Sequence, residues 1–110
     1  MIRMWKGIVI KESLENPHVL WETQELNVKV GNKTKWHLAT VFCEKEAIEK
    51  IQKELKPDFF AHFWNEEKII VAFSEQLFEF EKKDSETRKK AIEFGKQKGI
   101  PTEQLDFATD

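Results

Sequence analysis

The segment from Phe59 to Glu81 constrains the fold of this 110-residue chain more than any other. Aromatic and apolar residues dominate 59–64 and 68–73, and apolar residues alternate with glutamates over 77–81. Only three residues separate each of these stretches from the next. Connections this short join antiparallel neighbours. The segment therefore predicts three adjacent antiparallel strands at the centre of an open sheet.

The rest of the chain supplies further strands and two helices. Strand-forming residues and alternating patterns predict strands over 4–10, 26–30 and 36–43. Apolar residues at helical spacing predict one helix over 44–55 and a second that begins at Asp84 or Ser85. The run Gly99-Ile100-Pro101 is typical of a helix end, because glycine reaches the left-handed conformation and proline prevents continuation.

The order of these elements predicts an α+β fold. A strand, a helix, two strands and a later helix are similar to the ferredoxin-like split arrangement. We expect residues 1–110 to form a single domain, with two helices on one face of an antiparallel sheet and an N-terminal β-hairpin of strands 4–10 and 26–30. That arrangement leaves the other sheet face bare, so a homodimer that covers it is expected.

Charge and cysteine content exclude several classes of function. The chain has 18 basic and 20 acidic residues and a net charge of −2. Nucleic-acid binding needs a concentrated basic field, so no nucleic-acid partner is expected. The lone Cys43 cannot form an intrachain disulfide, and the apolar runs are far shorter than the roughly 20 residues that span a bilayer. With no signal-peptide pattern either, we expect a cytoplasmic protein without a membrane partner.

Aromatic side chains are the first candidates for a binding site. Four Trp and nine Phe bring the aromatic content to 12%. Aromatic walls stack on flat ligands, and Trp is favoured at binding hot spots. Trp36, Trp64 and His62 are therefore the candidate ligand-binding residues, for a small aromatic ligand or a protein partner. A small core that uses large side chains for burial explains the same pattern more simply.

Histidines and the cysteine are weaker candidates. His37 and Cys43 lie about 20 Å apart on one strand, too far for one metal ion, and His62 approaches His37 only if their strands pair. No His-Glu-x-x-His or paired-cysteine spacing is present, so we expect no metal and no cofactor. His18 is expected to be exposed in a loop. The acidic Glu44 beside Cys43 opposes thiolate formation, which favours a structural thiol.

The residues His62, Trp64 and Asn65 suggest an alternative with catalysis. Some small dimeric ferredoxin-like proteins are cofactor-free or haem-degrading monooxygenases whose sites combine Asn, Trp and His. The segment resembles them in residue types, and the resemblance implies His62, Trp64 and Asn65 as catalytic candidates for an aromatic or haem-like substrate. His37 is a further candidate if its strand pairs with that of His62. In this sequence the three residues come from one strand and its turn rather than from separate elements. This is an analogy at the level of fold.

A second resemblance covers most of the chain. Its motifs are Lys6-Gly7-Ile8, His62-Phe63-Trp64 and the ending from Gly99 to Phe107. Together they resemble a group of small bacterial and archaeal proteins of about this length without an assigned activity. The resemblance implies no substrate or site, but it implies that 104–107 is ordered. Leu105 and Phe107 alternate as in a short edge strand.

These observations favour a binding or interaction protein that uses an aromatic sheet face over an enzyme. A small dimeric enzyme is the alternative. A protein that inhibits a partner, such as a regulator from a mobile element, is a third possibility.

Overall fold

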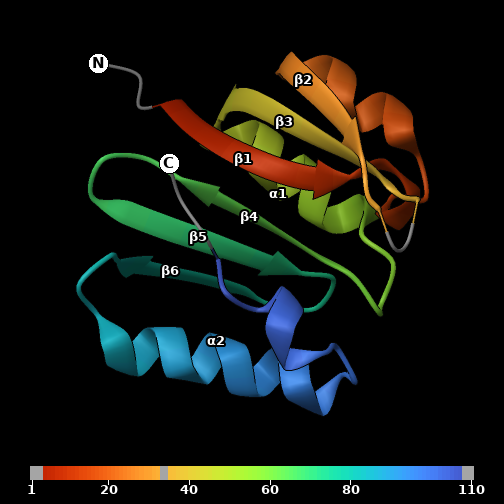
Figure 1. The fold of residues 1–110 in the computed structure, drawn as a ribbon. Coiled ribbons are helices and arrows are strands. Elements are labelled where there is room, and N and C mark those ends of the chain that lie inside the picture. The colour runs from red at the N-terminus through yellow and green to blue at the C-terminus, as the bar shows by residue number, and fades with distance from the viewer. Residues whose placement is uncertain (1–3, 33–34, 108–110) are drawn as a thin grey trace.

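The computed structural model describes residues 4–32 and 35–107. In this part of the chain, a six-stranded antiparallel sheet lies between two α-helices (Figure 1). The strands are β1 (Met4–Ile10), β2 (Gln24–Val30), β3 (His37–Glu44), β4 (Phe60–Trp64), β5 (Lys68–Phe73) and β6 (Leu77–Glu81). The helices are α1 (Lys45–Glu54) and α2 (Ser85–Gln97), and short 3-10 helices η1 (Lys11–Ser13), η2 (Pro17–Glu22) and η3 (Thr102–Gln104) complete the elements.

The three consecutive antiparallel strands expected from the sequence are confirmed, but they lie at one end of the sheet with β6 at its edge rather than at its centre. The sheet order is β2-β3-β1-β4-β5-β6, so β4, β5 and β6 follow one another in space as they do in the chain. Every strand pair is antiparallel. Asn65 helps to close the β4–β5 connection, because its side-chain oxygen accepts hydrogen bonds from the backbone N–H groups of Glu67 and Lys68.

The expected N-terminal β-hairpin is wrong. β1 pairs with β3 and β4, whereas β2 pairs with β3 only. β3 therefore lies between the two strands that were expected to pair. The connection that carries η1 and η2 is long enough to place β2 on the far side of β3, at the edge of the sheet.

The strand order also differs from the ferredoxin-like one. β3 and β4 are each antiparallel to β1, so they run parallel to one another with β1 between them, and α1 connects them. This unit is a split βαβ motif. Beyond it the chain continues outward through β5 and β6, and no strand follows α2 within residues 98–107.

The expected edge strand at Leu105 and Phe107 is wrong too, although the segment is ordered. Both side chains are buried, and Phe107 has a positive φ of 49°. The segment turns inward after η3, because these two side chains pack into the core under α2 instead of alternating along a sheet edge.

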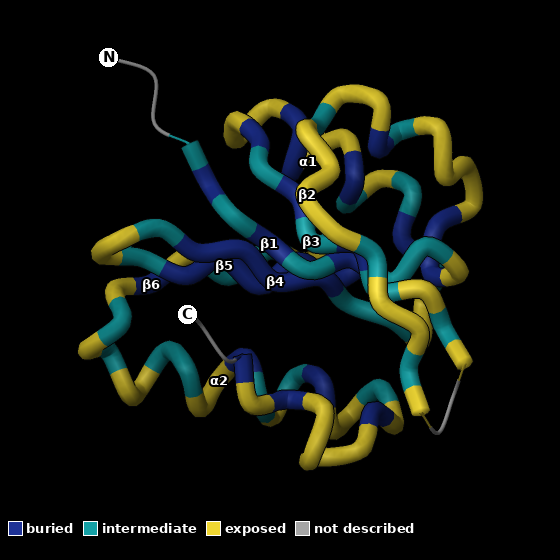
Figure 2. The backbone as a smooth tube through the Cα atoms, turned by 45° about the horizontal axis from the view of Figure 1, so that its top comes forward, coloured by how far each residue is buried: buried dark blue, intermediate teal, exposed yellow. Residues whose placement is uncertain are grey.

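The two helices lie on opposite faces of the sheet, which corrects the expectation that both cover one face (Figure 2). α1 packs Ala47, Ile48 and Ile51 against one face, here called the α1 face. α2 packs Ala91 against the other, here called the α2 face. The reason lies in β4 and β5, whose side chains are buried on both faces. A strand that is apolar on both sides needs a cover on each side.

Gly7 and Gly95 both lie where a neighbouring side chain leaves too little room for a Cβ atom. A Cβ atom on Gly7 would lie 2.1 Å from Cδ2 of the Phe63 ring and 2.9 Å from the carbonyl oxygen of His62. The missing side chain of Gly7 therefore lets β1 and β4 lie close together. Gly95 gives room to Leu105, whose Cδ2 atom would lie 2.7 Å from an added Cβ. This helical glycine thus packs against the C-terminal segment.

Both ends of α2 follow the sequence prediction. The Asp84 side chain accepts a hydrogen bond from the backbone N–H of Thr87, as an N-cap does. Gly99 has a φ of 87°, and the backbone N–H of Ile100 donates to the carbonyl of Gly95 over 3.1 Å. These bonds satisfy the last carbonyl groups of the helix in a Schellman ending.

Candidate binding surface

The α2 face divides into a covered half and an open half. α2 and the C-terminal segment cover β4, β5 and β6. β1, β3 and β2 extend beyond this cover, and in Figure 2 the edge strand β2 is exposed along most of its length. Over residues 4–10 of β1 and 38–43 of β3, residues that point to the α1 face are buried and those that point to the α2 face are only half-buried. The surface of β1, β3 and β2 on this side is called the open half below.

Strand pairing arranges the open half in three rows. Directly opposed residues of antiparallel strands point to the same face. The rows, read from β2 through β3 to β1, are Gln24-Phe42-Lys6, Asn27-Thr40-Ile8 and Lys29-Leu38-Ile10. A bulge at Leu26 places one extra residue in β2, between Glu25 and Asn27.

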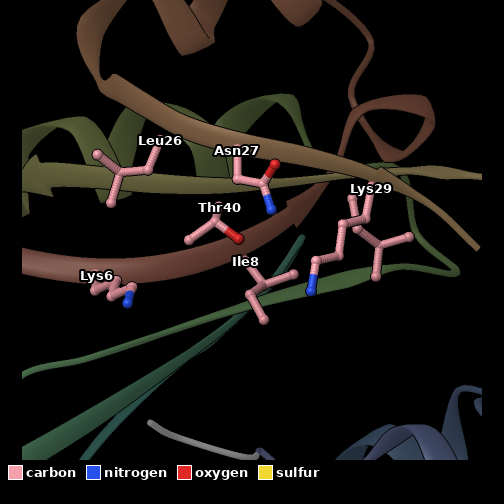
Figure 3. A pocket seen from close by; sticks show the side chains of 7 residues that line it. Lys6, Ile8, Leu26, Asn27, Lys29 and Thr40 are labelled. Carbon is pink, nitrogen blue, oxygen red and sulfur yellow. The ribbon is translucent and has the colours of Figure 1, made fainter.

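A shallow hollow of about 350 Å³ lies in this surface (Figure 3). Its described lining residues are Lys6, Ile8, Leu26, Asn27, Lys29, Leu38 and Thr40. In Figure 3 the Thr40 hydroxyl and the Asn27 amide lie at its centre, beside Ile8. The hollow therefore combines apolar contact area with polar groups that can orient a bound chain.

The charged residues in the described lining of the hollow are lysines. Two of its described lining residues are lysines and none is acidic. Lys29 is exposed on β2, and Lys6 is half-buried on β1. The nearest glutamate in β2, Glu25, is opposite Val41, whose side chain belongs to the α1-face core, and its carboxylate pairs with Lys11 at 3.3 Å.

The predicted ligand-binding residues His62 and Trp64 lie in the covered half. They are 9% and 5% exposed, and their rings stack with centroids 5.2 Å apart. The Phe107 ring lies 6.2 Å from the His62 ring and 5.7 Å from the Phe60 ring. An aromatic ligand that stacked on His62 from this side would have to displace Phe107. Most aromatic side chains of the sheet thus lie in the core. The side chains of the open half are mainly aliphatic or positively charged.

The other catalytic candidates do not gather around His62. The Asn65 side-chain oxygen is engaged by two backbone N–H groups of its turn, at 3.0 and 2.8 Å. β1 separates β3 from β4, so the strand pairing that would bring His37 to His62 does not occur. His37 is exposed, and its Nδ1 atom lies 2.5 Å from Oε2 of Glu12.

The Glu12–His37 contact is a local surface pair. The His37 backbone N–H donates to Oε1 of Glu12 over 2.7 Å. Burial works against the charged carboxylate, but the two hydrogen bonds from His37 outweigh it and lower the pKa of Glu12. The pair joins the end of η1 to the start of β3. The candidate Trp36, just before β3, meets the ring of Phe59 edge-on at 5.0 Å and is not among the described residues of the hollow.

Cys43 is a structural thiol. It is 2% exposed on the α1 face, opposite Trp5 in β1. Burial, together with the charge of Glu44, raises its pKa to about 11. His18 is exposed as expected, and its ring stacks on Trp21 at 4.3 Å. Among residues 4–32 and 35–107, no group of three or more His, Cys, Asp or Glu is placed to hold a metal ion.

Sequence reasoning missed the open half because it searched for aromatic and titratable residues. The sequence signal that could have identified the open half is a lysine among the alternating apolar residues of each of two strands. Lys6 and Lys29 interrupt the apolar pattern of β1 and β2 on the same face of the sheet, and lysine is rarely fully buried.

Comparison with known proteins adds no relative. Neither a family model, nor a curated protein, nor a solved structure matches this chain. In the described part of the chain, neither α1 nor α2 has the length and apolar character that crossing a bilayer requires. The geometry of the open half is therefore the feature that indicates a function.

Proposed function

We propose that this protein is a binding protein that docks a segment of another protein on the open half of its α2 face. The observation that carries the proposal is the incomplete cover of this face. Ile8 and Leu38 are half-buried there and Leu26 is 49% exposed, whereas Val9, Ala39 and Val41 on the α1 face of β1 and β3 are buried. Apolar side chains grouped around a hollow on one surface are typical of an interaction site.

The shape of the surface supports a protein segment as the occupant. A sheet face with aliphatic side chains and a shallow hollow presents area rather than an enclosed cavity. Small-molecule sites bury most of their ligand in a deep cleft, which this surface lacks, whereas side chains of a docked chain need only shallow depressions. The proposal deepens the sequence-based prediction of a binding protein and moves the surface from the aromatic to the aliphatic half of the face.

The homodimer predicted from the sequence is the alternative occupant of the open half. A second copy placed face to face on the open half would bring the lysines of both copies together, and like charges oppose such an interface. Static light scattering over a range of concentrations tests it directly. We expect a monomer, and a dimer that Leu26→Gln dissociates would instead identify the second copy as the occupant of the open half.

A peptide-display selection tests the proposed function. Random twelve-residue peptides on phage would be selected on the immobilised wild-type protein and measured against Leu26→Gln and a matched control, Val30→Gln. Leu26 and Val30 are both exposed on β2, at 49% and 57%, but Val30 is opposite His37 and outside the hollow. Both substitutions leave the net charge unchanged.

We expect enriched peptides to bind the wild type and Val30→Gln alike and to bind Leu26→Gln at least ~10-fold more weakly, since loss of a hot-spot side chain costs about 2 kcal/mol or more. Peptides that bind all three proteins equally would show that they use another surface. That result, or a selection that enriches no peptide, would contradict the proposal.

A further inference from the structure

We infer that the bound segment joins the sheet as an additional antiparallel strand beside β2, with a carboxylate side chain opposite Lys29. The inference rests on the proposed function and adds the backbone conformation and the charge of the partner. It comes from the outer edge of β2, the edge of the sheet that borders the open half.

The backbone of β2 directs hydrogen-bonding groups away from the sheet. The Gly31 N–H donates to the carbonyl of Trp36 over 2.9 Å, so the backbone of Gly31 is bonded toward β3. Because this direction alternates along a strand, the backbone groups of Lys29 also point to β3, whereas the N–H and C=O groups of Val28 and Val30 point outward. In the described part of the chain β2 pairs with β3 only, and no strand bonds these outward groups.

The opposite edge of the sheet is less suited to an added strand. On that side the Phe73 N–H donates to the carbonyl of Gln76, which sets the alternation along β6. The outward residues of β6 are then Leu77, Glu79 and Glu81. Charged residues on an edge strand oppose the addition of another strand. β2, with valines at the outward positions after its bulge, is therefore the edge that accepts one.

An extended backbone complements the outer edge of β2. The outward groups of Val28 and Val30 repeat at about 7 Å, which is the repeat of a β ladder. A peptide recognised by strand addition gains main-chain hydrogen bonds of this kind, whereas a helical segment has bonded most of its backbone groups internally. The bulge at Leu26 interrupts the repeat, so the added strand pairs with β2 from Asn27 onward.

Alternate side chains of the added strand contact the open half. Asn27 and Lys29 point to the α2 face, because they are opposite Thr40 and Leu38. Their counterparts in the added strand occupy non-hydrogen-bonded positions, where side chains of neighbouring strands are closest. Lys29 is exposed, so a carboxylate opposite it forms an ion pair of complementary charge. The side chain opposite Asn27 lies beside Leu26, which lines the hollow.

N-methylation of a selected peptide tests the backbone pairing. Each residue of an enriched peptide that depends on Leu26 would be N-methylated in turn, and binding to the wild type would be measured by isothermal titration calorimetry. A methyl group removes an N–H that donates to β2, but it leaves the bonds intact where the N–H points away. We expect binding to weaken at least ~5-fold at every second position of the paired stretch.

A pattern without this period of two would overturn the inference and leave the proposed function intact. The absence of any peptide that depends on Leu26 overturns both.

Val30→Pro tests the same bonds from the side of the protein. It removes one outward N–H, and an edge strand tolerates proline at such a position. Val30→Gln is the matched control, because it changes the side chain and keeps the N–H. We expect Val30→Pro to bind the peptide at least ~5-fold more weakly than Val30→Gln, with circular dichroism confirming that both are folded. Equal binding by the two folded variants would overturn the inference.

A charge exchange tests the carboxylate opposite Lys29. We expect the peptide to carry an acidic residue at a position that tolerates N-methylation. Replacing that residue by lysine should weaken binding, and Lys29→Glu should then strengthen it at least ~3-fold. Lys83 is exposed in the turn before α2, outside the hollow, so Lys83→Glu controls for net charge. Rescue by both variants or by neither would overturn the inference.

Light scattering tests a second copy as the occupant of this edge. We expect the wild type to stay monomeric. A dimer that Val30→Pro dissociates and Val30→Gln leaves intact would identify β2 of a second copy as the added strand, and the inference of a separate acidic partner would be overturned.

Discussion

The two halves of the α2 face belong to one sheet with one strand geometry, but their side chains differ in burial. In the covered half, Trp64, Val71 and Phe73 point to this side and are buried under α2 and the C-terminal segment. In the open half, Ile8 and Leu38 point to the same side and remain half-buried. The difference comes from the cover rather than from the strands, because α2 follows β6 and reaches only that end of the sheet.

The comparison shows why residue chemistry alone is a poor guide to the site. His62, Trp64 and Asn65 are the residues that suggest chemistry, and all three are held in structural contacts. Lys6, Asn27 and Thr40 suggest little in isolation, and they line a hollow on an accessible surface. Four predictions test how the open half differs from the covered half and from the α1 face.

The largest expected effect is on stability in the covered half. Phe107→Ala removes a fully buried ring that packs against Phe60 and His62, and we expect it to lower the free energy of unfolding by about 3 kcal/mol or more. Phe42→Ala makes the same deletion at a half-buried position of the open half and should cost about 1 kcal/mol. Urea unfolding measures both values, and equal losses would contradict the division.

A thiol probe should separate the α1 face from the open half by reaction rate. Burial, with a smaller contribution from Glu44, raises the pKa of Cys43 from 9.0 to about 11. The raised pKa keeps the thiol protonated at neutral pH, so its thiolate fraction is about 100-fold lower than that of an ordinary thiol. Leu26→Cys in a Cys43→Ala background places a thiol on the exposed edge strand instead.

We expect a disulfide reagent to label the new thiol at least ~100-fold faster than Cys43 at pH 7. The rate at Cys43 should rise as the pH approaches 11, because a raised pKa delays ionisation to higher pH. Comparable rates at neutral pH would show that the α1 face opens readily, and the contrast between the faces would then be lost.

Gly7→Ala tests how tightly the α1 face is closed. The new methyl group would overlap the Phe63 ring and approach the carbonyl oxygen of His62, and neither can move freely in the sheet. We expect a loss of about 1–3 kcal/mol in the free energy of unfolding. Gly95→Ala is the control, because there the methyl group meets the flexible end of Leu105 and gains up to about 1 kcal/mol of helix propensity. Thermal unfolding of both variants shows whether the rigid contact is the costly one.

The smallest effect is expected at the hollow itself. Leu26→Gln and Val30→Gln both change exposed side chains of β2, so each should alter the free energy of unfolding by no more than about 0.5 kcal/mol. Circular dichroism melting curves measure this change. A large loss in Leu26→Gln alone would place Leu26 in the structural half of the face and would weaken its use as a binding probe.

Much of the fold could be predicted from the sequence, because the signals are local. The run from Phe59 to Glu81 predicted β4, β5 and β6, and the apolar stripe around Ile48 and Ile51 predicted α1. The Asp84 cap and the Gly99 ending of α2 were also predicted correctly. Each of these features is set by turn chemistry or by a period within a few neighbouring residues.

The candidate site could not be predicted in the same way. Whether β2 lies beside β1 or beside β3, and which face each helix covers, depends on contacts between residues far apart in the chain. The near-continuous apolar run of β5 was a usable sign that both faces of the sheet need cover, but it did not show which helix covers which face.

The amino-acid sequence by itself determined the α+β class, the β4-β5-β6 arrangement and the ends of α2. Hydrophobic periodicity, capping and turn preference act between residues that are close together in the chain. Only the tertiary structure decided that the helices lie on opposite faces, that Phe107 covers His62, and that Lys6 and Lys29 share an open surface. Those outcomes depend on which strands pair and on how far α2 reaches across the sheet, and both are settled by long-range packing.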